Sequence, residues 1–337
     1  MPHLQRRTFD GVQLYYEQLG STAGPRLFVL SPSNTSTKEL RPYLESYTQL
    51  ASKFNIVVFD HRGTGGSSMP PDGWGATDGW AAPSMKLLAA DALALLDALG
   101  WESAHVLGLS FGGMVAQEVA ISRPSAIQTL TLVCTSAGVG EGVALSYPLH
   151  TLLDSSSEER SATMLRLADL RRDSGWVYDS QEGQAVMQFM GGMEAALERT
   201  PGALEGRRWQ LTARSQHDTG ERLPGALLPE AGAARTIPTA VFAAVHDGLT
   251  PPQAALALSE ILGAADVHGG PIWFEAGHWP NLVREQPKMF AAALEEFTRD
   301  GRVSSALWSS SEELKGSIDW GRRFQRDNCL DGGCAIL

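Results

Sequence analysis

The alternation of two kinds of segment along the chain constrains the fold most strongly. Short apolar runs rich in β-branched residues (RLFVL, NIVVFD, AHVLGLS and IQTLTLVC) are typical of strands buried on both faces. Amphipathic stretches such as MKLLAADALALLDALG and FGGMVAQEVAISRP lie between them and have the periodicity of helices. Because strand alternates with helix, we expect an α/β fold with a doubly wound, mostly parallel sheet. The segment FDGVQLYYEQLG should add an antiparallel hairpin at its edge.

This alternation is interrupted once. From Ser136 to Arg235 the chain has the pattern of helices and polar loops, and strand patterns resume at TIPTAVFAAV and PIWFE. We therefore expect a helical cap inserted into the fold. The final residues are rich in serine, glycine and charge, which favours a flexible tail. The expected divisions are a first core part at 1–135, a cap at 136–235, a second core part at 236–300 and a tail at 301–337.

Charge and cysteine content exclude several classes of function. The net charge of −11 should repel phosphate backbones, so nucleic acid is not an expected partner. Neither a secretory signal nor a membrane-spanning run is evident, which favours a cytoplasmic protein. The three cysteines have neither the spacing of a zinc site nor that of a disulfide framework. We expect no metal and no organic cofactor.

A candidate nucleophile lies in the segment GLSFGG at 108–113, where an apolar strand pattern gives way to a helical one. Ser110 stands between two glycines, an arrangement typical of the sharp turn called a nucleophile elbow. Side chains two residues away would collide with neighbouring backbone, which explains the glycines. The amide of Phe111, at the start of the helix, is placed to stabilise negative charge on a bound carbonyl oxygen.

A nucleophilic serine needs a histidine base and an acid to orient it. The order along the chain in such folds is serine, acid, histidine. His278 follows the last strand pattern, in AGHWP, and Asp247 follows the preceding one, in AVHDGLTPP. Because parallel strands end at one edge of the sheet, these side chains should meet there. We predict a triad of Ser110, Asp247 and His278.

Taken together, these motifs resemble those of the α/β-hydrolase superfamily over residues 8–300. The resemblance rests on five segments in order: DGVQLYYEQLG, DHRGTGGSS, GLSFGGMVAQEVA, HDGLTPP and GHWPNLVREQP. Within the superfamily the chain is most similar to small-molecule esterases and lactonases typified by aclacinomycin methylesterase and oxoadipate enol-lactonase. The resemblance implies structural rather than catalytic roles for Asp60 and Arg62.

One segment departs from the pattern of many relatives, which have His-Gly after the third strand, where a backbone amide completes the oxyanion hole. This chain instead has Ser-Pro-Ser-Asn at 31–34. Proline has no amide proton to donate. The donor beside Phe111 should then be the amide of Ser33 or of Asn34, and the sequence leaves both open.

The expected reaction is hydrolysis of a small or medium hydrophobic carboxylic ester or lactone through an acyl-enzyme on Ser110. Trp176, Trp209 and the Met-rich stretch MQFMGGM indicate either an apolar substrate pocket or simply the cap's core. Two alternatives remain: hydrolysis of a carbon–carbon bond in a diketone-type substrate, and a non-catalytic, ligand-binding member of the fold. The oligomeric state is not predicted.

The chain ends in Cys334-Ala335-Ile336-Leu337, which matches a C-a-a-X prenylation signal whose leucine favours geranylgeranyl. Lipidation of Cys334 is one hypothesis, and a chance match is the other. A single prenyl chain would give only weak membrane association.

Overall fold

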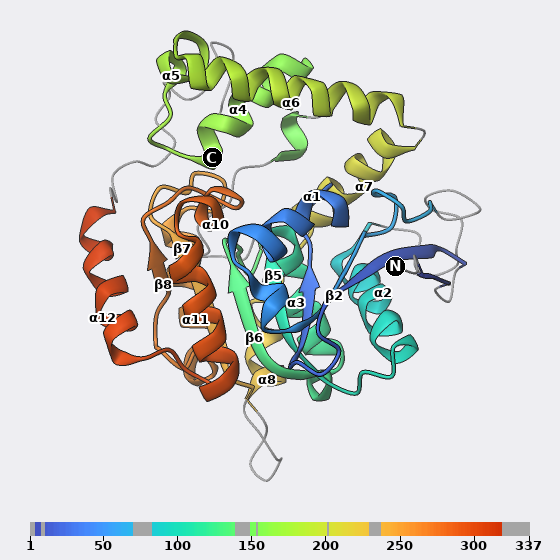
Figure 1. Cartoon of the computed structure of the whole chain (residues 1–337), viewed down its shortest axis with the longest axis vertical. Coiled ribbons are helices and arrows are strands. Elements are labelled where there is room, and N and C mark those ends of the chain that lie inside the picture. The colour runs from blue at the N-terminus through green and yellow to red at the C-terminus, as the bar shows by residue number, and fades with distance from the viewer. Residues whose placement is uncertain are drawn as a thin grey trace.

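Figure 1 shows the computed structural model of the chain, which describes residues 4–7, 11–69, 83–138, 149–152, 154–200, 202–228 and 237–318. Its centre is an eight-stranded sheet in the order β1-β2-β4-β3-β5-β6-β7-β8. The strands are β1 (Leu4–Arg7), β2 (Gln13–Gly20), β3 (Arg26–Leu30), β4 (Asn55–Phe59), β5 (Ala104–Leu109), β6 (Ile127–Val133), β7 (Thr239–Ala244) and β8 (Ile272–Phe274).

The sheet is parallel except around β2, which runs antiparallel to both β1 and β4. From β4 to β8 every neighbouring pair is parallel. Strands β3 to β6 are almost entirely buried because helices cover both faces, which explains their continuous apolar runs. The prediction of a doubly wound, mostly parallel sheet with an edge hairpin is confirmed.

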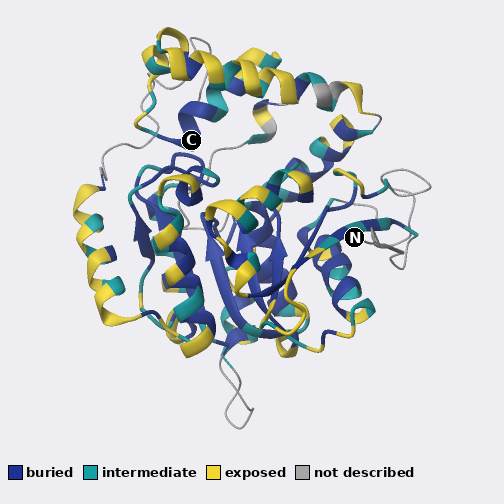
Figure 2. Ribbon diagram, viewed as in Figure 1, coloured by how far each residue is buried: buried dark blue, intermediate teal, exposed yellow. Residues whose placement is uncertain are grey.

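Two hydrophobic cores lie on opposite faces of the sheet. One contains the apolar faces of α2 (Met85–Ala98), α3 (Phe111–Ser122) and α9 (Pro252–Leu262). The other contains residues of α1 (Thr37–Pro42), α10 (Asn281–Glu285) and α11 (Pro287–Asp300). Figure 2 shows the buried sheet between these two layers. Short helical turns complete the core: η1 (Tyr43–Tyr47), η2 (Leu50–Ser52), η3 (Pro124–Ala126) and η5 (Gly263–Ala265).

Helices occupy the connection between β6 and β7. Most of them lie beyond one end of the sheet, and α7 descends from this layer to the core (Figure 1). They are η4 (Leu149–Leu152), α4 (Ser157–Ala168), α5 (Ser174–Asp179), α6 (Gln181–Arg199), α7 (Ala203–Ser215) and α8 (Leu223–Leu227). Leu223 and Leu227 of α8 pack into the core that contains α2, α3 and α9. The boundary at 136 lies within the described residues and the boundary at 235 lies outside them, and both stay predictions.

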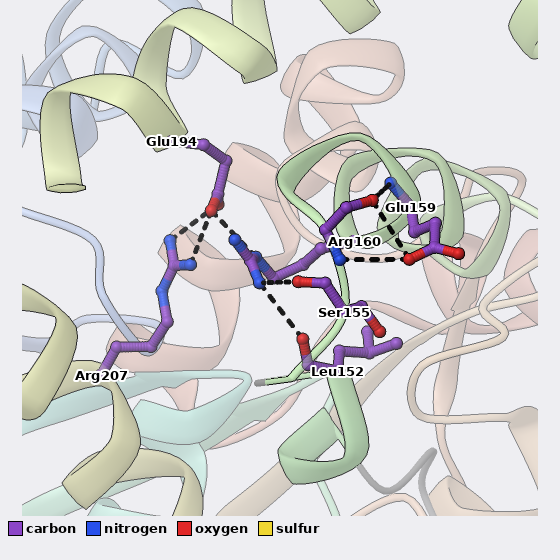
Figure 3. A network of polar contacts seen from close by, with 7 residues as sticks. Leu152, Ser155, Glu159, Arg160, Glu194 and Arg207 are labelled. Carbon is purple, nitrogen blue, oxygen red and sulfur yellow. Dashed lines mark hydrogen bonds and ion pairs between the residues drawn. The ribbon is translucent and has the colours of Figure 1, made fainter.

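A partly buried ion-pair network joins three of these helices (Figure 3). Glu194 of α6 accepts hydrogen bonds from Arg160 of α4 at 2.9 Å and from Arg207 of α7 at 2.7 Å. Arg160 also donates to the carbonyl oxygens of Leu152 and Ser155. Since one carboxylate accepts hydrogen bonds from guanidinium groups on two other helices, the network sets the positions of the three helices relative to one another.

A flexible tail from residue 301 was expected, and the structure requires a correction up to residue 318. Helix α12 (Ser305–Leu314), followed by η6 (Lys315–Ser317), packs beside the edge strand β8. The Ser311 hydroxyl, fully buried, accepts a hydrogen bond from the Trp273 amide at 2.6 Å. The helix covers an otherwise open edge, which polar composition alone does not reveal. Cys334 lies outside the described residues.

Among the described helices, none has the length and apolar composition needed to cross a membrane.

Candidate active site

Ser110 lies on a strained turn between β5 and α3. Its backbone has φ 52° and ψ −115°, a conformation that L-residues rarely adopt. The amide of Ser110 donates to the Val133 carbonyl oxygen at 2.8 Å, which helps to hold the turn in place. A β-carbon at Gly108 would lie 2.6 Å from the Cα of Gly113, and one at Gly112 would lie 2.0 Å from the Leu30 carbonyl oxygen. The glycines therefore permit the close approach that the elbow requires.

His278 lies in the loop after β8 and contacts both predicted partners. Its Nε2 is 2.9 Å from the Ser110 Oγ, and its Nδ1 is 2.6 Å from Oδ2 of Asp247. A carboxylate oxygen can only accept, so Nδ1 carries the proton and Nε2 is left as the acceptor for the serine hydroxyl. This is the tautomer that a general base for Ser110 needs.

Asp247 follows β7 and is 1% exposed. Its Oδ1 accepts hydrogen bonds from the amides of Leu249 and Thr250, each at 2.8 Å, which leaves Oδ2 for His278. Three donors to one buried carboxylate fix its orientation and stabilise its charge. The structure thus brings together the three residues that the sequence predicted, from loops after three different strands.

Cys134, at the end of β6, lies beside the acid and base. A ligand atom of Cys134 lies within 4.8 Å of those of Asp247 and His278. Burial raises the pKa of the Cys134 thiol, and the negative charge of Asp247 raises it further. A protonated thiol is a poor metal ligand, and the other two side chains already bond each other, so we do not assign a metal site here.

Buried contacts hold the loop after β3. The carbonyl oxygen of Ser31 accepts a hydrogen bond from Nε2 of His61 at 3.0 Å, and the ring of His61 packs edge-on against that of Phe111, with centroids 5.5 Å apart. Burial lowers the pKa of His61 to about 4, so the ring is neutral at pH 7. The amide of Asn34 donates to Oε1 of Gln210 at 2.9 Å. Of the two predicted donors, Asn34 therefore already has a partner.

The residues expected to be structural in the DHRGTGGSS segment make structural contacts. Asp60 accepts hydrogen bonds from the amides of Thr37 and Gly66, at 2.5 and 2.8 Å. Burial raises the pKa of Asp60 to about 6. Arg62 forms a bidentate ion pair with Asp91 of α2, at 2.6 and 2.7 Å, and both side chains are 1% exposed.

The C-terminal end of α4 contacts the loops of the acid and the base. The amide of His278 donates to the Ala168 carbonyl oxygen at 2.6 Å, and that of Gly248 donates to the Leu167 carbonyl oxygen at 2.9 Å. On α7, Arg214 is near enough to Asp247 for the two charges to interact. Burial lowers the pKa of Arg214 to about 10, while Asp247 opposes that shift.

Sequence reasoning missed Gln210, Arg214 and the 167–168 segment. They lie in ordinary helical sequence with no motif around them, so no local signal could have identified them.

Met187, Met190 and Trp176 pack within the cap, against Ala162 and Leu165. Their composition therefore reflects the cap's own small core. Other apolar side chains face solvent: Phe189 is 68% exposed and Met193 is 41% exposed. Trp209 belongs to the core that contains α2, α3 and α9. The aromatic and Met-rich stretch thus gives no support to an apolar substrate pocket.

Comparisons with known proteins agree with the observed fold. The family model of the alpha/beta hydrolase fold matches residues 42–284. The rhodomycin D methylesterase DnrP of Streptomyces peucetius is 34% identical over 137 residues, which are 39% of this chain and 41% of the relative's length. The 2-hydroxymuconate semialdehyde hydrolase of Pseudomonas sp. strain CF600 is 28% identical over 76% of this chain and 81% of the relative.

Among solved structures, the enol-lactonase of Burkholderia xenovorans LB400 superimposes with a TM-score of 0.64 at 19% identity. The match covers 88% of this chain and all of that one (100%), and at this identity it bears on the fold alone.

Proposed function

Because this chain belongs to the alpha/beta hydrolase family, we propose that it is a serine hydrolase that cleaves a small or medium carboxylic ester or lactone. The observation that carries the proposal is the hydrogen-bond chain from Ser110 through His278 to Asp247, with distances of 2.9 and 2.6 Å. An isolated serine is a weak nucleophile, and a base in this position is what activates it.

In the proposed cycle Ser110 Oγ attacks the acyl carbon while Nε2 of His278 takes the hydroxyl proton. The carbonyl oxygen becomes an oxyanion, which accepts hydrogen bonds from the amides of Phe111 and Ser33. As the bond between the acyl carbon and the alcohol oxygen breaks, His278 returns the proton to the leaving alcohol. A water activated by His278 then hydrolyses the acyl-enzyme and restores Ser110. Asp247 stays ionised and keeps the imidazole oriented.

Ser33 is the preferred second donor because the amide of Asn34 is bonded to Gln210. Phe111 is suited to the other role because the first amides of a helix have no carbonyl partner within it. Both donors would then flank the carbonyl oxygen, and neither needs a metal ion or organic cofactor to act.

The proposed hydrophobic character of the substrate rests on the apolar side chains next to the acid and base loops. The apolar side chains in the segment that contacts the acid and base loops are Leu167, which is buried, and Leu170, which is half-buried. A series of esters with acyl groups of increasing length tests this point. If the substrate is apolar, kcat/KM should rise with chain length until the acyl group no longer fits.

A panel of methyl esters, activated esters and lactones, assayed with the purified protein and with Ser110→Ala, tests the reaction. We expect turnover by the native chain and a loss of at least about 10³-fold in the variant, since removing a triad member removes nearly all of its contribution. Reaction with a fluorophosphonate probe should label Ser110 and not the variant. If the folded protein neither turns over any substrate nor reacts with the probe, it is a ligand-binding member of the fold.

A carbon–carbon bond hydrolase is the second candidate. It is favoured by the match to the 2-hydroxymuconate semialdehyde hydrolase, which extends over more of this chain than the methylesterase match does. A panel of diketones, with product identification, separates the two: carbon–carbon cleavage yields a carboxylic acid and a shortened ketone or its tautomer, without an alcohol. Activity on diketones without activity on esters would replace the ester proposal.

Prenylation of Cys334 stays a separate hypothesis, for which the relatives give no support. The intact mass of the protein isolated from its own host tests it. A C-terminus without an added lipid contradicts the hypothesis.

A further inference from the structure

Helix α7 contacts the two loops that border the predicted oxyanion hole. Gly206 and Gln210 are one turn apart and so lie on the same face of the helix. A β-carbon at Gly206 would lie 2.4 Å from the carbonyl oxygen of Gly63, so only glycine lets the helix approach the loop after β4 this closely. Figure 1 shows α7 running down from the cap to the core at this point.

Gln210 joins these two loops through its side-chain amide, which is fully buried. Its Oε1 accepts from the amide of Asn34 at 2.9 Å, and its Nε2 donates to Oγ1 of Thr64 at 2.7 Å. Both ends of the amide are therefore satisfied, and its orientation is fixed: reversing it would place the NH₂ group against the Asn34 amide proton.

The hydrogen bond to Asn34 acts on a residue of the oxyanion loop whose backbone conformation is unfavourable for most side chains. Asn34 has φ +54°, in the left-handed region that asparagine tolerates better than most residues. The loop is also held by the core at Ser31, through His61, and at Thr37, through Asp60. Between those two points, the Ser33–Asn34 peptide makes two described contacts: the Asn34 amide donates to Gln210, and the Ser33 carbonyl oxygen accepts from Oγ1 of Thr35 at 3.3 Å. Of these two, the bond to Gln210 is the one that ties the peptide to a segment outside the loop.

We propose that Gln210 is a positioning residue through which the cap holds the oxyanion hole in its working geometry. By fixing the peptide between Ser33 and Asn34, it orients the Ser33 amide toward the reacting carbonyl. Stabilisation of the transition state then depends on how α7 packs against the core. The catalytic effect of Gln210 rests on the proposed function, whereas the support that Gln210 gives to the loop does not.

The test compares Gln210→Met with Gln117→Met. Methionine fills a similar volume but neither accepts from Asn34 nor donates to Thr64. Gln117 is a matched control because it is also a fully buried glutamine that joins the helical insertion to the core: it donates to the Ser136 carbonyl oxygen at 2.9 Å and accepts from Thr219 at 2.5 Å. Both variants keep a buried side chain of similar volume and lose two hydrogen bonds, so a general loss of stability should be no smaller in Gln117→Met, whose two bonds are the more deeply buried.

We expect kcat on a good ester to fall on the order of 10-fold to 100-fold in Gln210→Met, somewhat less than the effect of removing an oxyanion donor outright. KM should change less than about threefold, because the oxyanion forms only in the transition state. In Gln117→Met, kcat should stay within about threefold of the native value. Equal losses of kcat in the two variants would overturn the proposal, because they would reflect lost stability alone.

Hydrogen–deuterium exchange of peptides covering residues 31–36 is the second readout, and it needs no substrate. Exchange in this loop should be faster in Gln210→Met than in both the native protein and Gln117→Met. Unchanged loop exchange overturns the proposal whatever the kinetics. If the native protein hydrolyses no ester, the proposed function fails, while the exchange experiment still decides whether Gln210 holds the loop.

Discussion

Replacing Gly112 with alanine tests whether the close contact between α3 and β3 sets both the stability of the elbow and the geometry of the oxyanion hole. The added β-carbon would lie 2.0 Å from the Leu30 carbonyl oxygen and 2.7 Å from that of Ser31. Real β-carbons approach no closer than about 3.0 Å, so the start of α3 and the end of β3 must separate by about 1 Å. The amide of Phe111 lies on one side of this contact and that of Ser33 on the other.

Two effects of different size follow from that displacement. Overpacking of a buried site costs about 1–3 kcal/mol, partly offset by the higher helix propensity of alanine, worth about 1 kcal/mol. Because backbone rather than a flexible side chain must move, we expect an overpacking cost near its upper limit, which leaves a net loss of about 2 kcal/mol of unfolding free energy. A misplacement of about 1 Å in a catalytic group lowers the rate roughly 10²-fold, so kcat should fall by about that factor.

Urea denaturation gives the change in unfolding free energy, and ester hydrolysis under conditions where the variant is fully folded gives kcat. Gly191→Ala is the matched control, since a β-carbon at Gly191, in the exposed part of α6, would have no neighbour within 4 Å. It should stabilise the protein by about 0.5–1 kcal/mol and leave kcat unchanged. A Gly112→Ala protein within about 0.5 kcal/mol of native stability and with native kcat would refute the reasoning.

Three further predictions concern buried polar groups. Arg62→Met removes the guanidinium group that is ion-paired with the buried Asp91 carboxylate and should reduce the unfolding free energy by about 3–5 kcal/mol. In urea titrations, the double variant with Asp91→Leu should recover part of this loss, and no recovery would contradict the ion-pair argument. Burial lowers the pKa of His217 to about 3, so as the pH falls below about 6.5 the imidazole is protonated in the unfolded chain but not in the folded one. The unfolding free energy should therefore decrease, by about 3 kcal/mol at pH 4.5. His217→Gln should flatten this pH dependence of stability, and an unchanged slope would contradict the role assigned to His217. Cys134→Asp introduces a carboxylate beside Asp247 and should raise the pKa of the carboxylate pair. The acidic limb of the pH profile of kcat/KM should then shift to higher pH. An unshifted limb would mean that the two groups are too far apart to interact.

Much of the fold could be predicted from the sequence because its signals are local. The buried strands of a parallel sheet are continuous apolar runs, and the elbow at Ser110 needs small residues in fixed positions around it. The order of serine, acid and histidine along the chain then identified Asp247 and His278. Their meeting could be inferred because parallel strands end at one edge of the sheet.

Other features depend on contacts between segments far apart in the chain. The helix α12 lies in a stretch whose polar composition resembles a flexible tail, and its place beside β8 depends on the edge strand rather than on its own sequence. The Met-rich stretch likewise could not be divided by composition into Met187 and Met190, which pack in the cap, and Phe189 and Met193, which face solvent.

The sequence by itself determined the class of fold and the three residues of the predicted triad, because periodicity and turn chemistry are properties of neighbouring residues. Only the tertiary structure decided which amide of the oxyanion loop already has a partner. Gln210 is 176 residues from Asn34 along the chain, and a glutamine within a helix carries no mark of the backbone group it will meet. Such a contact exists only once α7 is seated on the core, because the packing of the whole chain, and not any local preference, brings donor and acceptor within hydrogen-bonding distance.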